Sequence, residues 1–178
     1  MYRTMLVYGG VAGAVAIAAM LINMSAGVHS LLVGYLILFA ALSLIFVAIK
    51  TYRDKELGGV IRFSPAFGIG IGITLVASLI YVVVWEIYLA ATDYAFFADY
   101  TRAMVEEKGA EGAPAAEIAR MQAEMTAIGE SYNNSLPMRI GFTLLEIVPV
   151  GLLVTLASAA LLRNSSFLAA RGGGRSGA

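Results

Sequence analysis

The sequence predicts an all-α integral membrane protein with four transmembrane helices and an extracytoplasmic amphipathic helical hairpin between the third and fourth. The first observation is composition: 60% of the 178 residues are hydrophobic and only 13% are charged, whereas a soluble domain carries about 25% charged residues. The second is that the apolar residues lie in four long blocks, and the third is that the charges lie between these blocks. The formal net charge is zero, so we expect no nucleic-acid partner.

Four segments are long enough to be membrane spans, since crossing roughly 30 Å of hydrocarbon takes about 20 helical residues. They are residues 5–24, 30–49, 65–91 and 138–162. The first segment is predicted to be a retained span rather than a signal peptide. Its apolar run exceeds the roughly 7–15 residues of a signal h-region, and its small residues are spread along it. Residues 1–165 are therefore expected to form one membrane domain.

The orientation follows from the lysines and arginines, which are enriched in cytoplasmic segments. They precede the first span, lie between the second and third spans, and follow the fourth: Arg3; Lys50, Arg53, Lys55, Arg62; Arg163, Arg171, Arg175. The turn between the first two spans has none. This pattern predicts a multi-pass protein of the bacterial inner membrane with cytoplasmic N- and C-termini. The loop TYRDKELGG is expected to be a solvated, self-paired turn, and residues 166–178 to be a disordered glycine-rich tail.

The connection of residues 92–137 is predicted to lie outside and to contain a helical hairpin over about residues 95–132. Its apolar side chains recur at helical spacing on both sides of a GAEGAP break: Tyr94, Phe97, Tyr100, Met104, and then Ile118, Met121, Met125, Ile128. Two amphipathic helices on the outer face explain these stripes. The stripes either pack at the membrane interface or dock a partner, and simple packing is the plainer interpretation.

Glycines spaced four apart indicate helix-packing faces, because small residues let helix backbones approach closely. Gly9 and Gly13 form one such pair in the first span, and Gly68 and Gly72 form another in the third. These faces offer more close-packing surface than four helices need. The expected partners are therefore the lipid bilayer, further copies of this chain in a homo-oligomer, and another membrane protein.

Two carboxylates inside apolar spans are the principal candidates for a functional site, because intramembrane acids are rare and costly. Glu86 lies about 8 Å below the outer end of its span and Glu146 about 12 Å below the outer end of its own, at 1.5 Å per residue. The two spans are antiparallel, so the two side chains are expected at similar depth. Helical phase places Glu86 on the face of Gly68, Gly72, Leu75 and Leu79, which we expect to be an interior face.

Other polar groups are expected near these carboxylates. Arg139 lies seven residues before Glu146 on the same helical face, and Asn23 and His29, at the outer turn, reach a similar depth. Pro149 is predicted to kink the fourth span and to leave a backbone carbonyl unpaired. Three arrangements remain open: the two carboxyl groups share a proton, they pair with Arg139, or they hold a cation with His29 as a third ligand. The sequence does not identify a metal.

Three stretches resemble the bacterial membrane domain-of-unknown-function family 4199: IKTYRDKELGGVIRF, WEIYLAATDY and LLEIVPVGL. The resemblance extends over nearly the whole chain, including the four spans and the outer connection. It implies an integral inner-membrane protein. It implies no activity and no catalytic residue, so it assigns no role to any side chain.

The functional prediction is a non-enzymatic protein without a cofactor. The sequence has no cysteine and one histidine, and it contains no nucleophile–base set, metal motif or nucleotide-binding fingerprint. A structural, regulatory or partner-binding membrane subunit is the first hypothesis. The alternative is a small homo-oligomeric transporter or channel, coupled to protons or cations, that uses Glu86 and Glu146. Trp85, Tyr88 and Tyr94 are expected to form an aromatic belt at the outer interface.

Overall fold

The computed structural model describes residues 1–26 and 31–169, and this part of the chain is helical without any strand. The helices are α1 (Tyr2–Ser25), α2 (Leu31–Leu42), α3 (Leu44–Glu56), α4 (Phe63–Ala91), α5 (Phe96–Ala110), α6 (Ala115–Asn133) and α7 (Leu136–Leu162).

The described part of the chain has four helical segments that are long and apolar enough to cross a membrane, as the sequence predicts. They are α1, the combined α2 and α3, α4 and α7. The second segment extends to Glu56, beyond the predicted end at residue 49, and its predicted first residue lies outside the described residues. A break at Ser43 divides it into α2 and α3. The Ser43 hydroxyl donates a hydrogen bond to the Ala40 carbonyl at 2.6 Å, a contact that is often found where helices bend.

Helix α4 is the centre of the bundle and packs most extensively against α1 and α7. Against α1 the contact is close because of glycine. A Cβ atom on Gly9 would lie 2.7 Å from the Cβ of Val76, and one on Gly13 would lie 2.8 Å from the Ala77 carbonyl oxygen. A larger residue at either position would therefore push the two helices apart.

The contact between α4 and α7 uses a reciprocal pairing that the sequence pattern did not indicate. Gly70 of α4 faces Thr155 of α7, and Gly151 of α7 faces Thr74 of α4. A Cβ atom on Gly70 would lie 2.5 Å from the Thr155 Cγ2 atom, and one on Gly151 would lie 2.4 Å from the Thr74 Cγ2 atom. Each glycine thus accommodates the threonine of the other helix, which sets both the separation and the rotation of the two helices.

The predicted interior face of α4 is wrong. Leu75 and Leu79 are 62% and 64% exposed, and a Cβ atom on Gly68 would meet nothing within 4 Å. Gly72 does pack, because a Cβ atom there would lie 2.6 Å from the Met5 sulfur. The reason is that the close contacts of α4 run through Gly70 and its helical neighbours, so the helix is rotated relative to the phase that the Gly68 pattern indicated.

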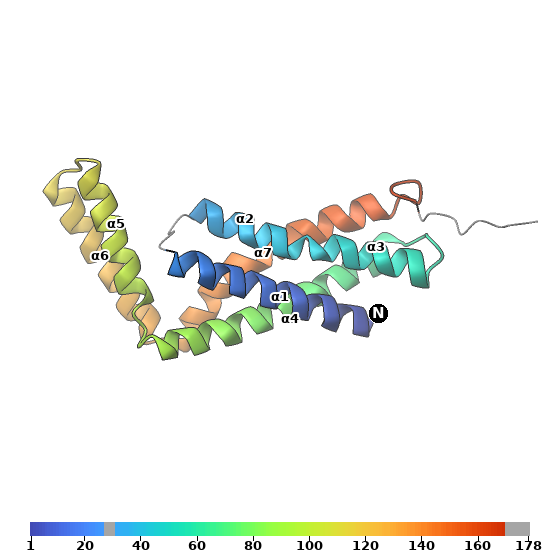
Figure 1. The fold of residues 1–178 in the computed structure, drawn as a ribbon, viewed down its shortest axis with the longest axis horizontal. Coiled ribbons are helices and arrows are strands. Elements are labelled where there is room, and N and C mark those ends of the chain that lie inside the picture. Colours follow the sequence, from blue (N-terminus) through green and yellow to red (C-terminus); the bar gives the residue numbers. More distant parts are fainter. Residues whose placement is uncertain (27–30, 170–178) are drawn as a thin grey trace, which may run out of the picture.

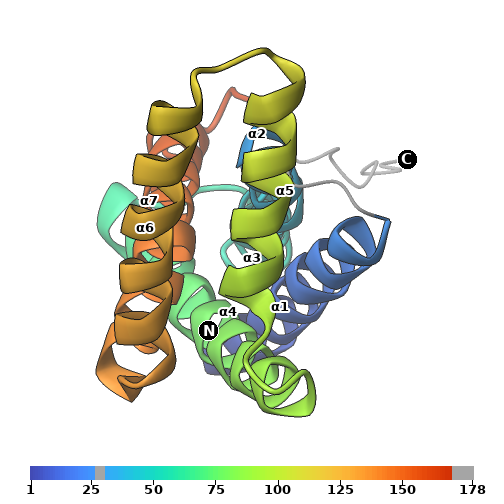
Figure 2. The same ribbon diagram turned by 90° about the vertical axis from the view of Figure 1, so that its left-hand side faces the viewer.

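The N-terminus, the connection between α3 and α4, and the end of α7 lie at one end of the bundle, and α5 and α6 lie at the other (Figure 1). Helices α5 and α6 pack against each other, and Figure 2 shows them side by side across that end of the long helices. We call them the helix pair. The outward surfaces of the long helices carry large exposed apolar side chains, which suit contact with lipid: Leu6, Val11, Leu32, Phe39, Leu75, Leu79, Leu145, Leu153.

Arg53 is buried rather than solvated, contrary to the expectation for its loop. It is 0% exposed, and its guanidinium donates to the carbonyls of Phe167 at 2.9 Å and Leu168 at 2.7 Å. Its Nε donates to Asp54, which also binds Lys50, so the loop is self-paired as expected. Because Arg53 holds residues 167 and 168 beside the end of α7, the described part of the predicted tail is fastened to the bundle.

Candidate functional site

The site is built at the junction where the ends of α4 and α7 meet the helix pair. The chain leaves α4 through a sharp turn in which Asp93 and Tyr94 have φ angles of 49° and 57°. The left-handed conformation costs about 1–2 kcal/mol for a residue other than glycine. The Tyr94 amide donates to the Leu89 carbonyl at 2.8 Å. This turn directs α5 back across the end of α4.

A group of four residues holds this turn in place, and we call it the clamp: Glu86, Tyr94, Asn133 and Arg139. Arg139 Nε donates to both carboxylate oxygens of Glu86 at 3.0 Å, and its Nη1 donates to the Asn133 carbonyl at 2.8 Å. The guanidinium carbon lies 5.1 Å from the centre of the Tyr94 ring, and the Asn133 side-chain amide donates to the Tyr94 carbonyl at 3.2 Å. The clamp therefore joins α4, the turn, α6 and α7.

An aromatic cluster lies beside the clamp. The Trp85 indole N–H donates to the Tyr132 hydroxyl at 2.8 Å, and the Trp85 ring centre lies 5.0 Å from that of Phe96. Tyr132 in turn contacts Phe97 at 4.7 Å and Phe142 at 6.0 Å between ring centres. Trp85 is only 6% exposed, so it packs internally between the bundle and the helix pair and does not face the outer interface as a belt residue would.

The Tyr132 phenol lies within the electrostatic influence of both candidate carboxylates. Burial raises the pKa of Tyr132 above its ordinary value, although the hydrogen bond from Trp85 acts in the opposite direction. The charges of Glu86 and Glu146 both raise this pKa further, and that of Arg139 lowers it. The phenol thus stays neutral over a wider pH range.

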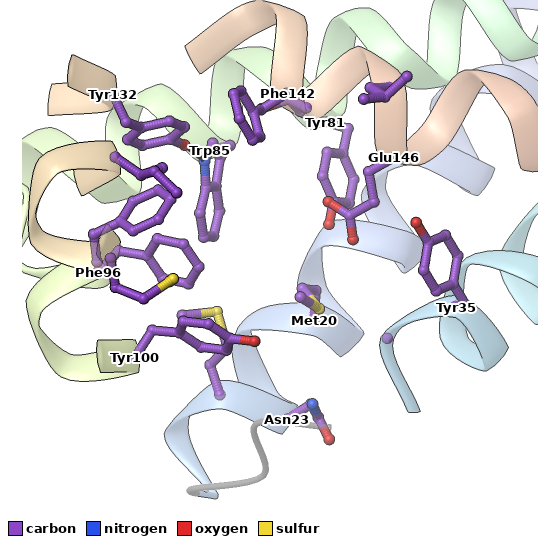
Figure 3. A pocket seen from close by; sticks show the side chains of 17 residues that line it. Met20, Asn23, Tyr35, Tyr81, Trp85, Phe96, Tyr100, Tyr132, Phe142 and Glu146 are labelled. Atoms are coloured by element: carbon purple, nitrogen blue, oxygen red, sulfur yellow. Dashed lines mark hydrogen bonds between the residues drawn. The ribbon is translucent and has the colours of Figure 1, made fainter. Parts of the chain in front are cut away.

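Glu146 lies in different surroundings from Glu86. It lines a cavity of about 450 Å³ between the helix pair and the bundle, whereas neither Glu86 nor Arg139 lines it. In Figure 3 the Glu146 carboxylate and the Tyr81 and Tyr35 hydroxyl groups point into this cavity. Among the described residues Glu146 makes no hydrogen bond or ion pair. The two carboxylates therefore do not pair with each other in this part of the chain: Glu86 binds Arg139, and Glu146 faces the cavity.

The remaining candidates are placed as follows. Asn23 lines the same cavity as Glu146, as depth suggested, and His29 lies outside the described residues. Helix α7 continues through Pro149 to Leu162, so the proline does not end the helix. In the described part of the chain no three histidine or acidic side chains come close enough to hold a metal ion.

The sequence indicated the clamp only in part and the cavity not at all. Arg139 was a candidate partner of Glu86, but Asn133 and Tyr94 stand in the connection between the third and fourth spans, where no pattern relates them to Arg139. Tyr81 lies four residues before Trp85 on the same helical face, which was an available signal. Tyr35 reaches the cavity from α2, and only the packing of the bundle shows this.

The chain matches a family model over residues 7–164, and the description of that family is protein of unknown function (DUF4199). No curated protein and no solved structure matches the chain significantly. The family match covers α1 from residue 7 onward, the other long helices and the helix pair.

Proposed function

The chain belongs to the DUF4199 family of proteins of unknown function, and we propose that it is a partner-binding subunit of the bacterial inner membrane rather than an enzyme. The observation that carries this proposal is the clamp. The Glu86–Arg139 ion pair is partly buried, so the cost of its desolvation offsets much of its stabilising effect, and its value lies in fixing geometry. Here it fixes the helix pair on the bundle in one orientation. The helix pair then presents its outer surface to a second protein without a further ordering cost.

The charge of the helix pair defines the kind of partner. Residues 92–137 contain eight acidic and three basic residues, an excess of five negative charges. All three basic side chains already pair locally, in Arg102–Asp99, Lys108–Glu111 and Arg120–Glu124. The acidic residues that remain, such as Glu106 and Glu117, are exposed. A partner with a basic outer segment complements this surface.

Cysteine labelling tests the outer location of the helix pair, which the distribution of lysine and arginine supports. The chain has no native cysteine. A cysteine at the exposed Ala110 is expected to react with an impermeant maleimide added to intact cells, whereas one at the exposed Leu57 should react only after the cells are opened. Labelling of the Leu57 position alone in intact cells would reverse the proposed orientation.

Photo-crosslinking in native membranes tests the partner. A photoreactive amino acid at the exposed Ala119 of α6 is expected to give an adduct with one other membrane protein, and charge reversal by Glu117→Lys should weaken this adduct. The same amino acid at Leu145, on the lipid-facing side of α7, serves as the matched control. Adducts that are identical from both positions, or adducts with this chain alone, would contradict the proposal.

A second candidate function rests on Glu146. This carboxylate faces a cavity and has no ion-pair partner among the described residues, and intramembrane acids often mark proton or ion pathways. Glu86 is engaged with Arg139, so transport would use Glu146 alone and would need several copies of this four-span chain. Proteoliposomes with an internal pH dye test this hypothesis. A proton leak that Glu146→Gln abolishes would support a transporter, and a tight membrane with folded protein would reject it.

A further inference from the structure

We propose that the cavity between the helix pair and the bundle binds a hydrophobic organic cation, with the Glu146 carboxylate as its counter-ion. This inference does not depend on the partner proposed for the helix pair. The cavity volume of about 450 Å³ lies within the range of about 300–1,000 Å³ that is typical of small-molecule sites. It is lined by residues of α1, α2, α4, α5, α6 and α7.

The cavity opens to the apolar, lipid-facing surface of the bundle. Three of its lining side chains, Tyr35, Phe142 and Leu145, are 47%, 46% and 71% exposed. They lie on α2 and α7, whose outward sides are apolar. A ligand that partitions into the membrane can therefore enter between these helices without crossing a polar surface.

The charge of the cavity selects a cation. Among the described residues that line the cavity, Glu146 is the one ionisable acidic or basic side chain other than tyrosine, and its carboxylate points inward (Figure 3). The Arg139 guanidinium binds Glu86 and does not line the cavity, so it does not neutralise Glu146. An ionised carboxylate in apolar surroundings is costly unless it takes up a proton or a positive charge accompanies it. A bound cation supplies that charge.

The aromatic lining favours an organic cation over a metal ion. Trp85, Phe96 and Tyr100 line the cavity on one side and Tyr81 lies beside Glu146 (Figure 3). Aromatic faces attract organic cations within about 6 Å of the ring centre. A hard metal ion such as Ca²⁺ instead needs about six to eight oxygen ligands, and the lining offers one carboxylate. A neutral acyl chain would leave that carboxylate unpaired.

The protein carries its own reporter for this site, because its single tryptophan, Trp85, lines the cavity. The test titrates the full chain in a neutral detergent with tetraphenylphosphonium and, separately, with tetraphenylborate. These ions have the same shape and opposite charge. We expect a saturable change in tryptophan fluorescence with the cation and only a weak, non-saturating change with the anion. Equal responses to the two ions would mean that the cavity takes up apolar molecules or detergent without using Glu146, and would overturn the proposal.

Substitution then assigns the effect to the carboxylate. Glu146→Gln should weaken binding of tetraphenylphosphonium by about tenfold or more, since it removes the counter-charge and keeps the size. Glu146→Asp keeps the charge and should bind more tightly than the glutamine variant. Glu56→Gln, at the exposed end of α3 and away from the cavity, is the matched control and should bind like the unmodified chain. Unchanged affinity in folded Glu146→Gln would refute the role of Glu146, and the comparison of the two ions on the unmodified chain remains decisive if that variant does not fold.

Discussion

Removing one charge of the clamp should destabilise the fold by an amount that the burial of the pair determines. The Arg139 side chain is 9% exposed and that of Glu86 is 22% exposed. An exposed pair contributes about 0–1 kcal/mol, and loss of one partner from a fully buried pair costs about 3–5 kcal/mol. The Glu86–Arg139 pair lies between these limits. Arg139 also keeps its bond to the Asn133 carbonyl, so we expect Glu86→Leu to cost about 1–3 kcal/mol.

The glutamine substitution separates hydrogen bonding from charge. In Glu86→Gln the amide oxygen still accepts from Arg139 Nε, so the expected loss is below about 1 kcal/mol. In the double variant Glu86→Leu/Arg139→Met both charges are absent and no buried group of the pair is left alone. Its destabilisation should therefore be smaller than the sum of the two single variants, by about 2 kcal/mol.

Unfolding in mixed micelles with increasing sodium dodecyl sulfate measures these differences through tryptophan fluorescence. Trp85 is a suitable probe because its indole donates to Tyr132 of the helix pair at 2.8 Å, so loss of the junction changes its environment. Glu106→Leu, on the exposed surface of α5, is the matched control and should shift stability by no more than about 0.5 kcal/mol. Additive effects of Glu86→Leu and Arg139→Met within about 0.5 kcal/mol would refute the clamp.

Three further predictions concern packing and assembly. Gly13→Leu should destabilise the chain by about 1–3 kcal/mol through overpacking against α4. Gly68 faces open space, so Gly68→Leu should leave thermal unfolding of the monomer unchanged. Equal destabilisation by the two substitutions would contradict the packing described. Arg53→Lys should speed proteolysis of the segment around Leu168, because an ammonium cannot reproduce the planar fork of the guanidinium; an unchanged cleavage rate would contradict that contact. Native mass spectrometry is expected to show a dimer or higher oligomer, which Gly68→Leu should weaken, and monomer alone in several detergents would count against self-association.

Much of the architecture could be predicted from the sequence because the membrane makes it a local property. Each span must satisfy its own backbone hydrogen bonds and must match the hydrocarbon thickness, so apolar length alone located α1, α4 and α7. The end of the second span was less certain, since Arg53 is charged but buried. Arg53 was wrongly predicted to be solvated, because the carbonyl groups of residues 167 and 168, which accept its hydrogen bonds, are distant in sequence.

The sequence by itself determined that Glu86 and Glu146 lie inside spans and that Arg139 shares a helical face with Glu146. Only the tertiary structure decided which partner each carboxylate has. Each helical residue turns the side chain by about 100°, so a small rotation of α4 or α7 exchanges one neighbour for another. That rotation is set by the contacts of Gly70 with Thr155 and of Gly151 with Thr74, which depend on the shapes of both helices together. Glu86 consequently meets Arg139, and Glu146 faces the cavity.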